Sequence, residues 1–283
     1  MTRRLAWLNE KGGSGKSTSA LNISANLATR FGKKVLLVDV DHQANITAVL
    51  TKSEPNAQTL TDVLMDDAPV AEVIRETPYE NLHLLPADAS LSEVNVAMAD
   101  PSNPLGMGRE LRLKRVLNTI DNDYDFVVVD TSPQRTLLNV NVLNYVEEVF
   151  VPIDPGYFSI MGVQNLEKLL QQVREYMDHK TLHISGVLLT KMQHTNVARE
   201  VEKQIRDYFG DLVLKVSIPL NVKVEEAHSR GISVGDYAPE SPGAQAYLAV
   251  TEQILAYEHQ TNGFGVRVAA PAPDDGTGST ANA

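Results

Sequence analysis

The sequence predicts a doubly wound α/β fold, in which a mostly parallel sheet carries helices on both faces. Short runs rich in Val, Leu and Ile alternate along the chain with segments of helical periodicity, and this alternation is typical of βαβ units. The runs are continuously apolar, which indicates strands that are covered on both sides, as in a parallel sheet. The 283 residues are enough for one large domain of this kind.

Six apolar runs are expected to form strands, and a seventh is a weaker candidate. Each is short, rich in β-branched or leucine side chains, and bounded by polar or turn-forming residues. In chain order, strands are expected at 5–8, 33–41, 124–132, 147–154, 183–191 and 212–220, with the weaker candidate at 81–87.

Five intervening segments are expected to form helices, because their apolar side chains recur at spacings that share one helix face. The first of them ends at Gly32, a residue type suited to the left-handed position that follows a helix. The expected helices cover 17–31, 109–121, 160–178, 196–209 and 242–259.

We expect one domain over residues 1–260, followed by a disordered tail at 261–283. The tail is small, polar and rich in Pro and Gly, and it lacks the periodic apolar face of a membrane-binding helix. No apolar window approaches the roughly 18–20 residues of a membrane span, and the N-terminus has no signal-peptide pattern. These features predict a cytoplasmic protein without a membrane anchor.

The composition excludes several classes of site. The chain has no cysteine, which removes disulfides, thiolate zinc sites, thiol nucleophiles and Cys-ligated iron–sulfur clusters. Its seven histidines show no metal-ligand spacing. The net charge of −11 gives no global attraction to DNA or anionic lipid, so binding to either would need a local basic patch.

Residues 10–18, EKGGSGKST, form a variant of the P-loop pattern G-x-x-x-x-G-K-[ST] between an expected strand and an expected helix. The alternative interpretation is a glycine-rich turn with a solvated lysine. Glycines allow the backbone N–H groups to approach phosphate oxygens closely, and the following helix directs its positive end at them. The residues expected to bind ATP here are Lys11, Gly12, Gly13, Ser14, Gly15, Lys16, Ser17 and Thr18.

Each polar side chain of this loop has an expected partner. Lys16 supplies a positive charge to the β- and γ-phosphates, and the Ser17 hydroxyl is suited to Mg²⁺. Thr18 is placed for the α-phosphate. The sequence therefore predicts ATP and Mg²⁺ as ligands.

Lys11 distinguishes this loop, because KGGxGK[ST] is the deviant Walker A pattern. Here the chain resembles the ParA/MinD family of P-loop ATPases, closest to partition ATPases without an N-terminal helix-turn-helix domain, and the resemblance covers nearly all of residues 3–259. It implies that Lys11 reaches across the interface of an ATP-dependent homodimer to the partner's nucleotide. The alternative is an ordinary surface lysine.

Further matches suggest roles for acidic residues. Residues 35–47, VLLVDVDHQANIT, resemble the family's second strand and switch I, and this resemblance implies that Asp41 orients the attacking water. Asp39 is interpreted as structural or indirectly linked to the metal. Residues 124–134, YDFVVVDTSPQ, resemble the Walker B strand and switch II, where Asp130 would hold Mg²⁺.

The C-terminal segment 217–255 resembles the part of the family that carries a loop over the adenine, so Pro219 and Asn221 are candidate base contacts. The alternative is simple entry into a helix. His42, Ala44 and Thr131-Ser132 depart from the family's switch patterns, which implies an altered turnover rate or partner response.

Partition members of the family bind DNA nonspecifically through basic residues in this C-terminal part. Segment 190–235 holds seven Lys or Arg against six Asp or Glu, which is nearly neutral, and Leu220 stands where the family has Arg. The alternative is therefore a solvated surface of mixed charge. The candidate DNA-binding residues are Lys191, Lys203, Lys215, Lys223 and Arg230.

The resemblance implies a slow ATPase that joins two copies on binding ATP, binds nucleoid DNA and responds to a ParB-like or other cargo adaptor protein. Its cargo would be a plasmid, a chromosome or a protein assembly. Two alternatives remain at this point. One is a MinD-like or other regulatory ATPase that does not bind DNA, and the other is a nucleotide-gated scaffold with negligible turnover.

Overall fold

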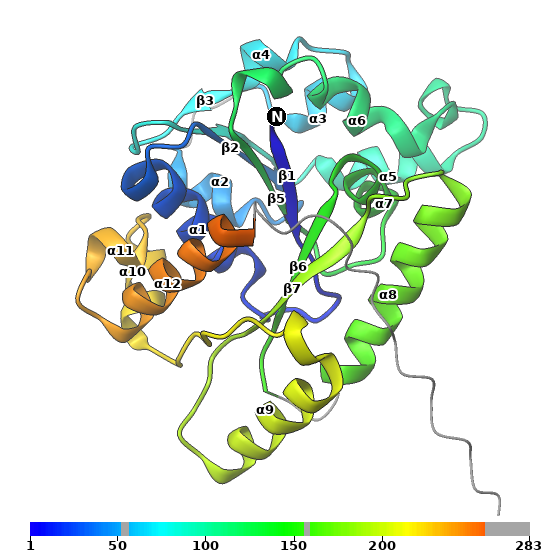
Figure 1. Ribbon diagram of the computed structural model, residues 1–283. Helices are drawn as coiled ribbons and strands as arrows, with labels where there is room; N and C mark the ends of the chain where they lie inside the picture. Colours follow the sequence, from blue (N-terminus) through cyan, green and yellow to red (C-terminus); the bar gives the residue numbers. More distant parts are fainter. Residues whose placement is uncertain (52–56, 156–158, 258–283) are drawn as a thin grey trace, which may run out of the picture.

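The structure, a computed structural model, describes residues 1–51, 57–155 and 159–257. A twisted sheet runs through its centre, and helices lie on both sides of it (Figure 1). The described strands all belong to this one sheet. The predicted domain boundary at 260 and the predicted tail at 261–283 lie outside the described residues.

The described sheet has seven strands in the order β3-β4-β2-β5-β1-β6-β7. Neighbouring strands are parallel, except β3 and β4, which are antiparallel. The predicted doubly wound, mostly parallel sheet is therefore confirmed. The strands are β1 Arg3–Trp7, β2 Val35–Val40, β3 Arg75–Glu76, β4 Leu82–Leu85, β5 Phe126–Thr131, β6 Glu148–Ile153 and β7 His183–Leu189.

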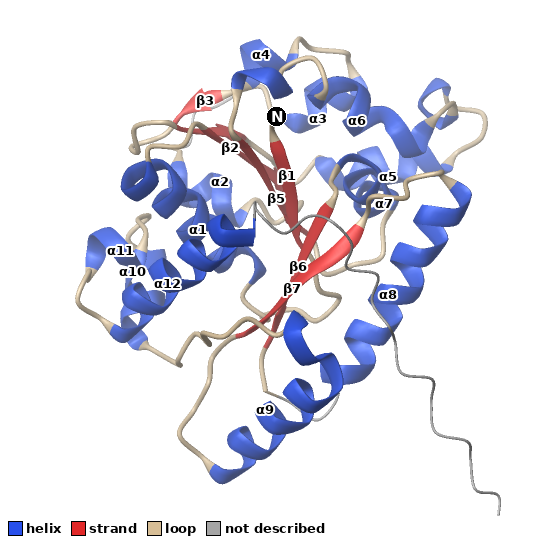
Figure 2. Ribbon diagram, viewed as in Figure 1, coloured by secondary structure: helices blue, strands red, loops and turns tan. Residues whose placement is uncertain are grey.

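Helices cover both faces of the sheet (Figure 2). Among the described residues, no helix is both long and apolar enough to cross a bilayer. The helices are α1 Lys16–Phe31, α2 Asn45–Leu50, α3 Leu60–Met65, α4 Val70–Val73, α5 Leu91–Ala99, α6 Arg112–Leu117, α7 Leu137–Tyr145, α8 Ser159–Tyr176, α9 Asn196–Phe209, α10 Val222–Ser229, α11 Val234–Tyr237 and α12 Pro242–Ala256, with short 3₁₀ turns η1 Pro104–Gly106, η2 Arg109–Leu111, η3 Asp121–Asp123 and η4 Gly210–Leu212.

Each central strand contributes to two apolar cores, one on each face of the sheet. Val127 and Val129 of β5 pack in the core shared with α3, α5, α6, α7 and α8, whereas Val128 packs in the core shared with α1 and α12. Successive side chains of a strand point to opposite faces. Both faces are buried, which explains why the strands read as continuous apolar runs.

The sheet register gathers polar groups at the carboxyl edge of the central strands. Asp130 of β5 lies in register with Asp39 of β2 on one side and with Trp7 of β1 on the other. The P-loop follows β1 directly, so it begins at the same edge. Ligands of open α/β sheets bind at this edge, where the order of the strands reverses.

The strand predicted at 212–220 is wrong. Within the described chain, this segment follows η4 and pairs with β7 and the residues after it as isolated bridges, Val187–Val213 and Met192–Pro219, while Leu214 and Ile218 pack in the core shared with α1 and α12. Pro219 has no backbone N–H to donate, so a continuous ladder is unfavourable here. The sheet therefore ends at β7.

The prediction of one helix at 109–121 is only partly correct, because the range holds η2 and α6 and ends where η3 begins. Gly32 does follow α1 in the left-handed conformation, as predicted (φ 60°). The sequence patterns missed β3 and several helices, among them α7. Its Asn139, Asn141 and Asn144 are buried, so α7 lacks the polar face by which a surface helix is recognised.

Ala44, at the start of α2, adopts the left-handed conformation with φ 50°. A Cβ atom makes this conformation unfavourable for residues other than glycine. Its amide nonetheless donates to the backbone oxygen of Asp41 at 2.8 Å, which closes the turn that leads into α2. An alanine at this position therefore places strain in switch I.

Replacing Ala44 with Gly should raise the free energy of unfolding by about 0.5–1 kcal/mol, because relief of the left-handed strain outweighs the greater freedom of the unfolded chain. Ala48, exposed inside the same helix, is the matched control, and Ala48→Gly should lower stability by about 1 kcal/mol. Urea unfolding of both variants measures the difference. Equal losses in the two variants would contradict the strain.

Candidate nucleotide-binding site

Two glycines and a threonine shape the loop between β1 and α1. Gly13 and Gly15 have φ values of 72° and 95°, which only glycine adopts readily. Gly12 has no such value, and a Cβ there would meet nothing within 4 Å, so the need for glycine at position 12 does not arise within one chain. The buried Thr190, just after β7, donates to the backbone oxygen of Ser14 at 2.8 Å and holds the turn in place.

Lys11 lies at the exposed rim of this loop. The Asn9 side chain accepts from the Lys11 amide at 2.9 Å and donates to the Pro152 oxygen at 2.7 Å, which anchors the loop's first residues to β6. The Lys11 ammonium forms an ion pair with Asp154, and its side chain is 52% exposed. In the single chain, Lys11 is thus paired within its own subunit. Sequence patterns did not indicate Asp154.

Lys16, the other lysine of the motif, is only 5% exposed. Its ammonium donates to the Lys11 backbone oxygen at 3.3 Å. Burial lowers its pKa, while the negative charges of Asp130 and Asp41 oppose that shift. The loop thus holds a buried cation whose desolvation is only partly offset by the two acids, and an anionic ligand would offset it further.

Asp130 is fully buried, and neither carboxylate oxygen has a hydrogen-bond partner. Burial and the neighbouring charge of Asp39 raise its pKa well above the ordinary 3.8, and the Ser17 hydroxyl and Lys16 act in the opposite direction. Ser17 interacts with the carboxylate without completing a hydrogen bond of normal geometry. An unpartnered carboxylate beside a hydroxyl fits the oxygen ligands that Mg²⁺ prefers.

Asp39 is also buried, but its oxygens are occupied. They accept from the amide and hydroxyl of Thr47, at 3.0 and 2.8 Å, and from the Asp41 amide at 3.2 Å. Burial raises its pKa to about 6 in spite of these bonds. Asp39 therefore ties α2 to the end of β2, which is a structural role, and an indirect link to the metal stays a prediction.

Asp41 lies at the head of switch I and is 5% exposed. Its carboxylate accepts from the Gln43 amide at 3.0 Å, and His42 Nδ1 lies 3.5 Å from Asp41 Oδ1. The structure brings Asp41 close enough to Lys16 for their charges to interact. Of the predicted residues, Lys16, Ser17, Asp41 and Asp130 thus gather at one place.

The comparisons with known proteins agree with this geometry. The chain matches the AAA domain family over residues 2–184. It is 37% identical over 261 residues to the chromosome-partitioning ATPase Soj of Treponema pallidum, an alignment that covers 92% of this chain and 100% of the relative. The chain belongs to the ParA/MinD family of ATPases.

Solved structures extend the ParA/MinD relationship to the fold. A cobyrinic acid a,c-diamide synthase from Mycobacterium smegmatis, with bound ATP analogue and magnesium, superposes with a TM-score of 0.77 at 28% identity, covering 93% of this chain and 98% of the other. The cell division ATPase MinD of Pyrococcus furiosus gives a TM-score of 0.74 at 26% identity, with coverages of 90% and 99%.

The candidate adenine contacts of this ParA/MinD chain lie beside the end of β7. Pro219 forms an isolated bridge with Met192, two residues beyond Thr190. The Asn221 side chain caps α10 by accepting from the Lys223 amide at 2.8 Å. This is the helix entry that the sequence left open as the alternative for Asn221, and contact of either residue with a base stays a prediction.

The candidate DNA-binding residues do not form a single cluster in the described chain. Lys223 and Arg230 lie together over the Tyr237 ring, at 5.6 and 5.0 Å from its centroid. Lys203 lies on α9, away from α10 in Figure 1, and pairs with Asp207. Lys191 and Lys215 are both exposed, and Lys191 has a left-handed backbone conformation just after β7. Of the five candidates, only Lys223 and Arg230 are seen to lie together.

Asp130→Asn should stabilise the protein without nucleotide and Mg²⁺, by about 1–3 kcal/mol at pH 7, because it removes an unpartnered buried carboxylate. The raised pKa means that the folded chain prefers the protonated acid, so the contribution of Asp130 to stability falls as pH rises above about 4. The variant's advantage should therefore grow from pH 4 to 7. Urea unfolding across this range measures it, and an advantage independent of pH would contradict the assignment.

Proposed function

We propose that this chain is a partition-type ATPase that binds ATP with Mg²⁺, pairs with a second copy in the ATP state, and moves DNA-associated cargo through cycles of hydrolysis. One observation carries the proposal. Lys16, Asp130 and Asp41 meet, buried, at the glycine loop, while Lys11 stands at its exposed rim. The likeness to a chromosome-partitioning ATPase supports the partition role.

The loop supplies the groups that a triphosphate needs. Backbone N–H groups of the loop and the amino end of α1 face phosphate oxygens, and the Lys16 ammonium balances the β- and γ-phosphate charge. Ser17 and Asp130 would hold Mg²⁺, which, when bound, neutralises phosphate charge. The loop groups assigned to the nucleotide are those of Gly12, Gly13, Ser14, Gly15, Lys16, Ser17 and Thr18.

Asp41 is assigned to the hydrolytic water. A buried carboxylate held by the Gln43 amide keeps one orientation, so it can accept a hydrogen bond from water and direct the water's oxygen at the γ-phosphorus. The new P–O bond forms as the bond to ADP breaks, which releases ADP and inorganic phosphate. His42, near the same carboxylate, is positioned to influence the rate.

Lys11 is assigned to the second subunit's nucleotide. In the single chain it pairs with Asp154, but an ion pair this exposed contributes little stability. A triphosphate carries more charge than one carboxylate, so it competes well for the ammonium. Because only the paired state would offer Lys11 a partner's phosphates, ATP binding would favour the dimer by mass action.

Nonspecific DNA is the proposed surface, and a ParB-like adaptor the proposed partner. Since the net charge is −11, attraction to phosphate must come from local cations, of which Lys223 and Arg230 lie together beside Tyr237, with Lys223 also paired to Glu226. The net negative charge suits an adaptor with a basic segment. This assignment implies a cytoplasmic, nucleoid-associated protein.

Asp41→Ala should slow ATP hydrolysis by about 100-fold or more, because an oriented acceptor for the water is lost. ATP binding should persist, so the variant should accumulate as an ATP-bound dimer in size-exclusion chromatography with light scattering. Asp66→Ala, at an exposed position, is the control and should hydrolyse ATP like the wild type. Unchanged turnover in Asp41→Ala would refute the assignment.

Adding Lys11→Ala to the Asp41→Ala variant distinguishes the role of Lys11 from that of Lys16. The double variant should bind ATP and remain a monomer, since Lys16 and the glycine loop are intact but the bridge to the partner is gone. A persisting ATP-dependent dimer would show that Lys11 is not the bridge.

Lys223→Glu should weaken ATP-dependent retention of DNA and reduce the slope of log affinity against log salt by about 1, as expected for loss of one phosphate contact. Lys180→Glu reverses the charge of an exposed side chain shortly before β7, and it should leave both quantities unchanged. Filter binding across a salt series measures them. An equal deficit in the two variants would point to net charge rather than a local site.

A further inference from the structure

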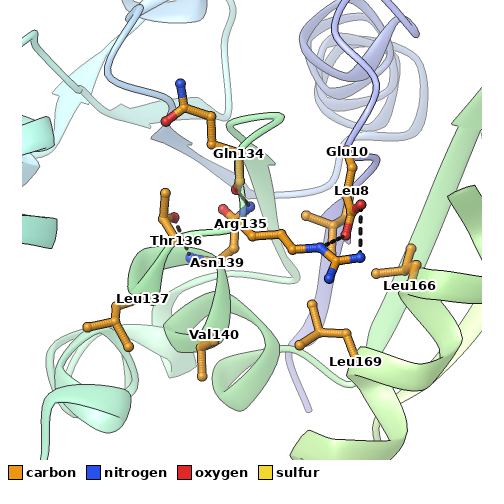
Figure 3. A pocket seen from close by; sticks show the side chains of 10 residues that line it. All are labelled: Leu8, Glu10, Gln134, Arg135, Thr136, Leu137, Asn139, Val140, Leu166 and Leu169. Atoms are coloured by element: carbon orange, nitrogen blue, oxygen red, sulfur yellow. Dashed lines mark hydrogen bonds and ion pairs between the residues drawn. The ribbon is translucent and has the colours of Figure 1, made fainter. Parts of the chain in front are cut away.

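Glu10 and Arg135 join the P-loop to switch II. Arg135, between β5 and α7, contacts Glu10 with both arms of its guanidinium: Nε bonds Glu10 Oε1, and the second arm donates to Oε2 at 3.1 Å (Figure 3). The two residues are 125 positions apart in the sequence. A two-point contact of this kind fixes orientation as well as distance.

Both residues of the pair stand on backbone that is already held. Glu10 is flanked by Asn9, bonded to β6, and by Lys11. Arg135 is flanked by Gln134, whose oxygen accepts from Asn139 at 2.7 Å, and by Thr136, whose hydroxyl caps α7. The ion pair therefore connects two ordered segments.

The same segments carry the proposed chemistry. Lys11 is the residue after Glu10, and switch II runs on from Asp130 through Ser132, whose oxygen also accepts from Asn139 at 3.1 Å. Asn139 is 5% exposed, so these bonds are shielded from water. A shift of switch II relative to the P-loop would thus have to break or drag the Glu10–Arg135 pair.

Beneath the pair lies a pocket of about 280 Å³ between the start of α7 and α8, lined by five apolar residues and five polar or charged ones (Figure 3). Glu10 and Arg135 both line this pocket, so their contact crosses it and joins the P-loop to the backbone before α7. The ion pair thus adds a direct connection between two segments that are each held separately by hydrogen bonds. The apolar lining residues are Leu8, Leu137, Val140, Leu166 and Leu169.

We infer that Glu10 and Arg135 are positioning residues for ATP hydrolysis. Their contact keeps the segment that carries Lys11 and the backbone after Asp130 at a fixed distance and orientation relative to each other. The inference rests on the ATPase activity proposed above and needs neither DNA nor an adaptor. The pair is partly exposed, with side-chain exposures of 61% for Arg135 and 30% for Glu10. Its contribution to stability is small, and its effect should appear in kcat.

A double-mutant cycle of Glu10→Gln and Arg135→Gln tests this. Each single variant should lower kcat about 3- to 10-fold with unchanged KM for ATP and unchanged Tm, and the double variant should be no slower than the slower single one. Arg135→Lys, which keeps the charge and loses the fork, should recover part of kcat. Lys180→Gln, in the exposed pair with Asp178, is the matched control and should be silent.

Losses that multiply in the double variant, or single variants with wild-type kcat, would overturn the inference. A parallel fall in Tm with no recovery in Arg135→Lys would assign the pair a structural role instead. A wild-type chain with no hydrolysis would refute the proposed function and this inference together. Loss of DNA retention alone would refute only the DNA part of that function.

Discussion

The site depends on the placing of buried opposite charges at the carboxyl edge of the sheet. Neither carboxylate oxygen of Asp130 has a hydrogen-bond partner in the protein, and Lys16, whose charge acts on it, is also buried. Each group is unfavourable alone, and each partly offsets the other. A fold that keeps them there retains a local instability that a Mg²⁺–triphosphate ligand is suited to relieve. The parallel register of β1, β2 and β5 is what brings the loop and the acids together.

Much of this could be read from the sequence because it is local. Residues 10–18 place the loop between a strand and a helix, and acids at strand ends must meet at one edge of a parallel sheet. The positive φ of Gly13 and Gly15 agrees with that reasoning. The prediction of a strand at 212–220 was wrong because the segment is as apolar as a strand, although Pro219 prevents a continuous ladder.

The remaining parts involve residues far apart in the chain. Thr190 holds the Ser14 backbone, Asp154 holds Lys11, and Arg135 holds Glu10, across separations of 125 to 176 positions. No spacing rule indicates such pairs in a single sequence. The three buried asparagines of α7 likewise hid a helix whose polar side chains bond to neighbouring backbone instead of water. Local reasoning finds the loop that holds the ligand and misses the supports that keep the loop in place.

The irregular pairing of residues 213–220 with the end of β7 has a consequence for nucleotide exchange. In the described chain this segment adjoins β7 through two isolated bridges rather than a ladder, and it carries the loop expected over the base. Leu214 and Ile218 are buried in the core shared with α1 and α12, and their amides donate to the backbone oxygens of Val187 and Leu189 in β7, so the residues before the loop are fixed to the sheet. We therefore expect this loop to keep its place beside the end of β7 while nucleotide is exchanged, so that its position is set before the base binds.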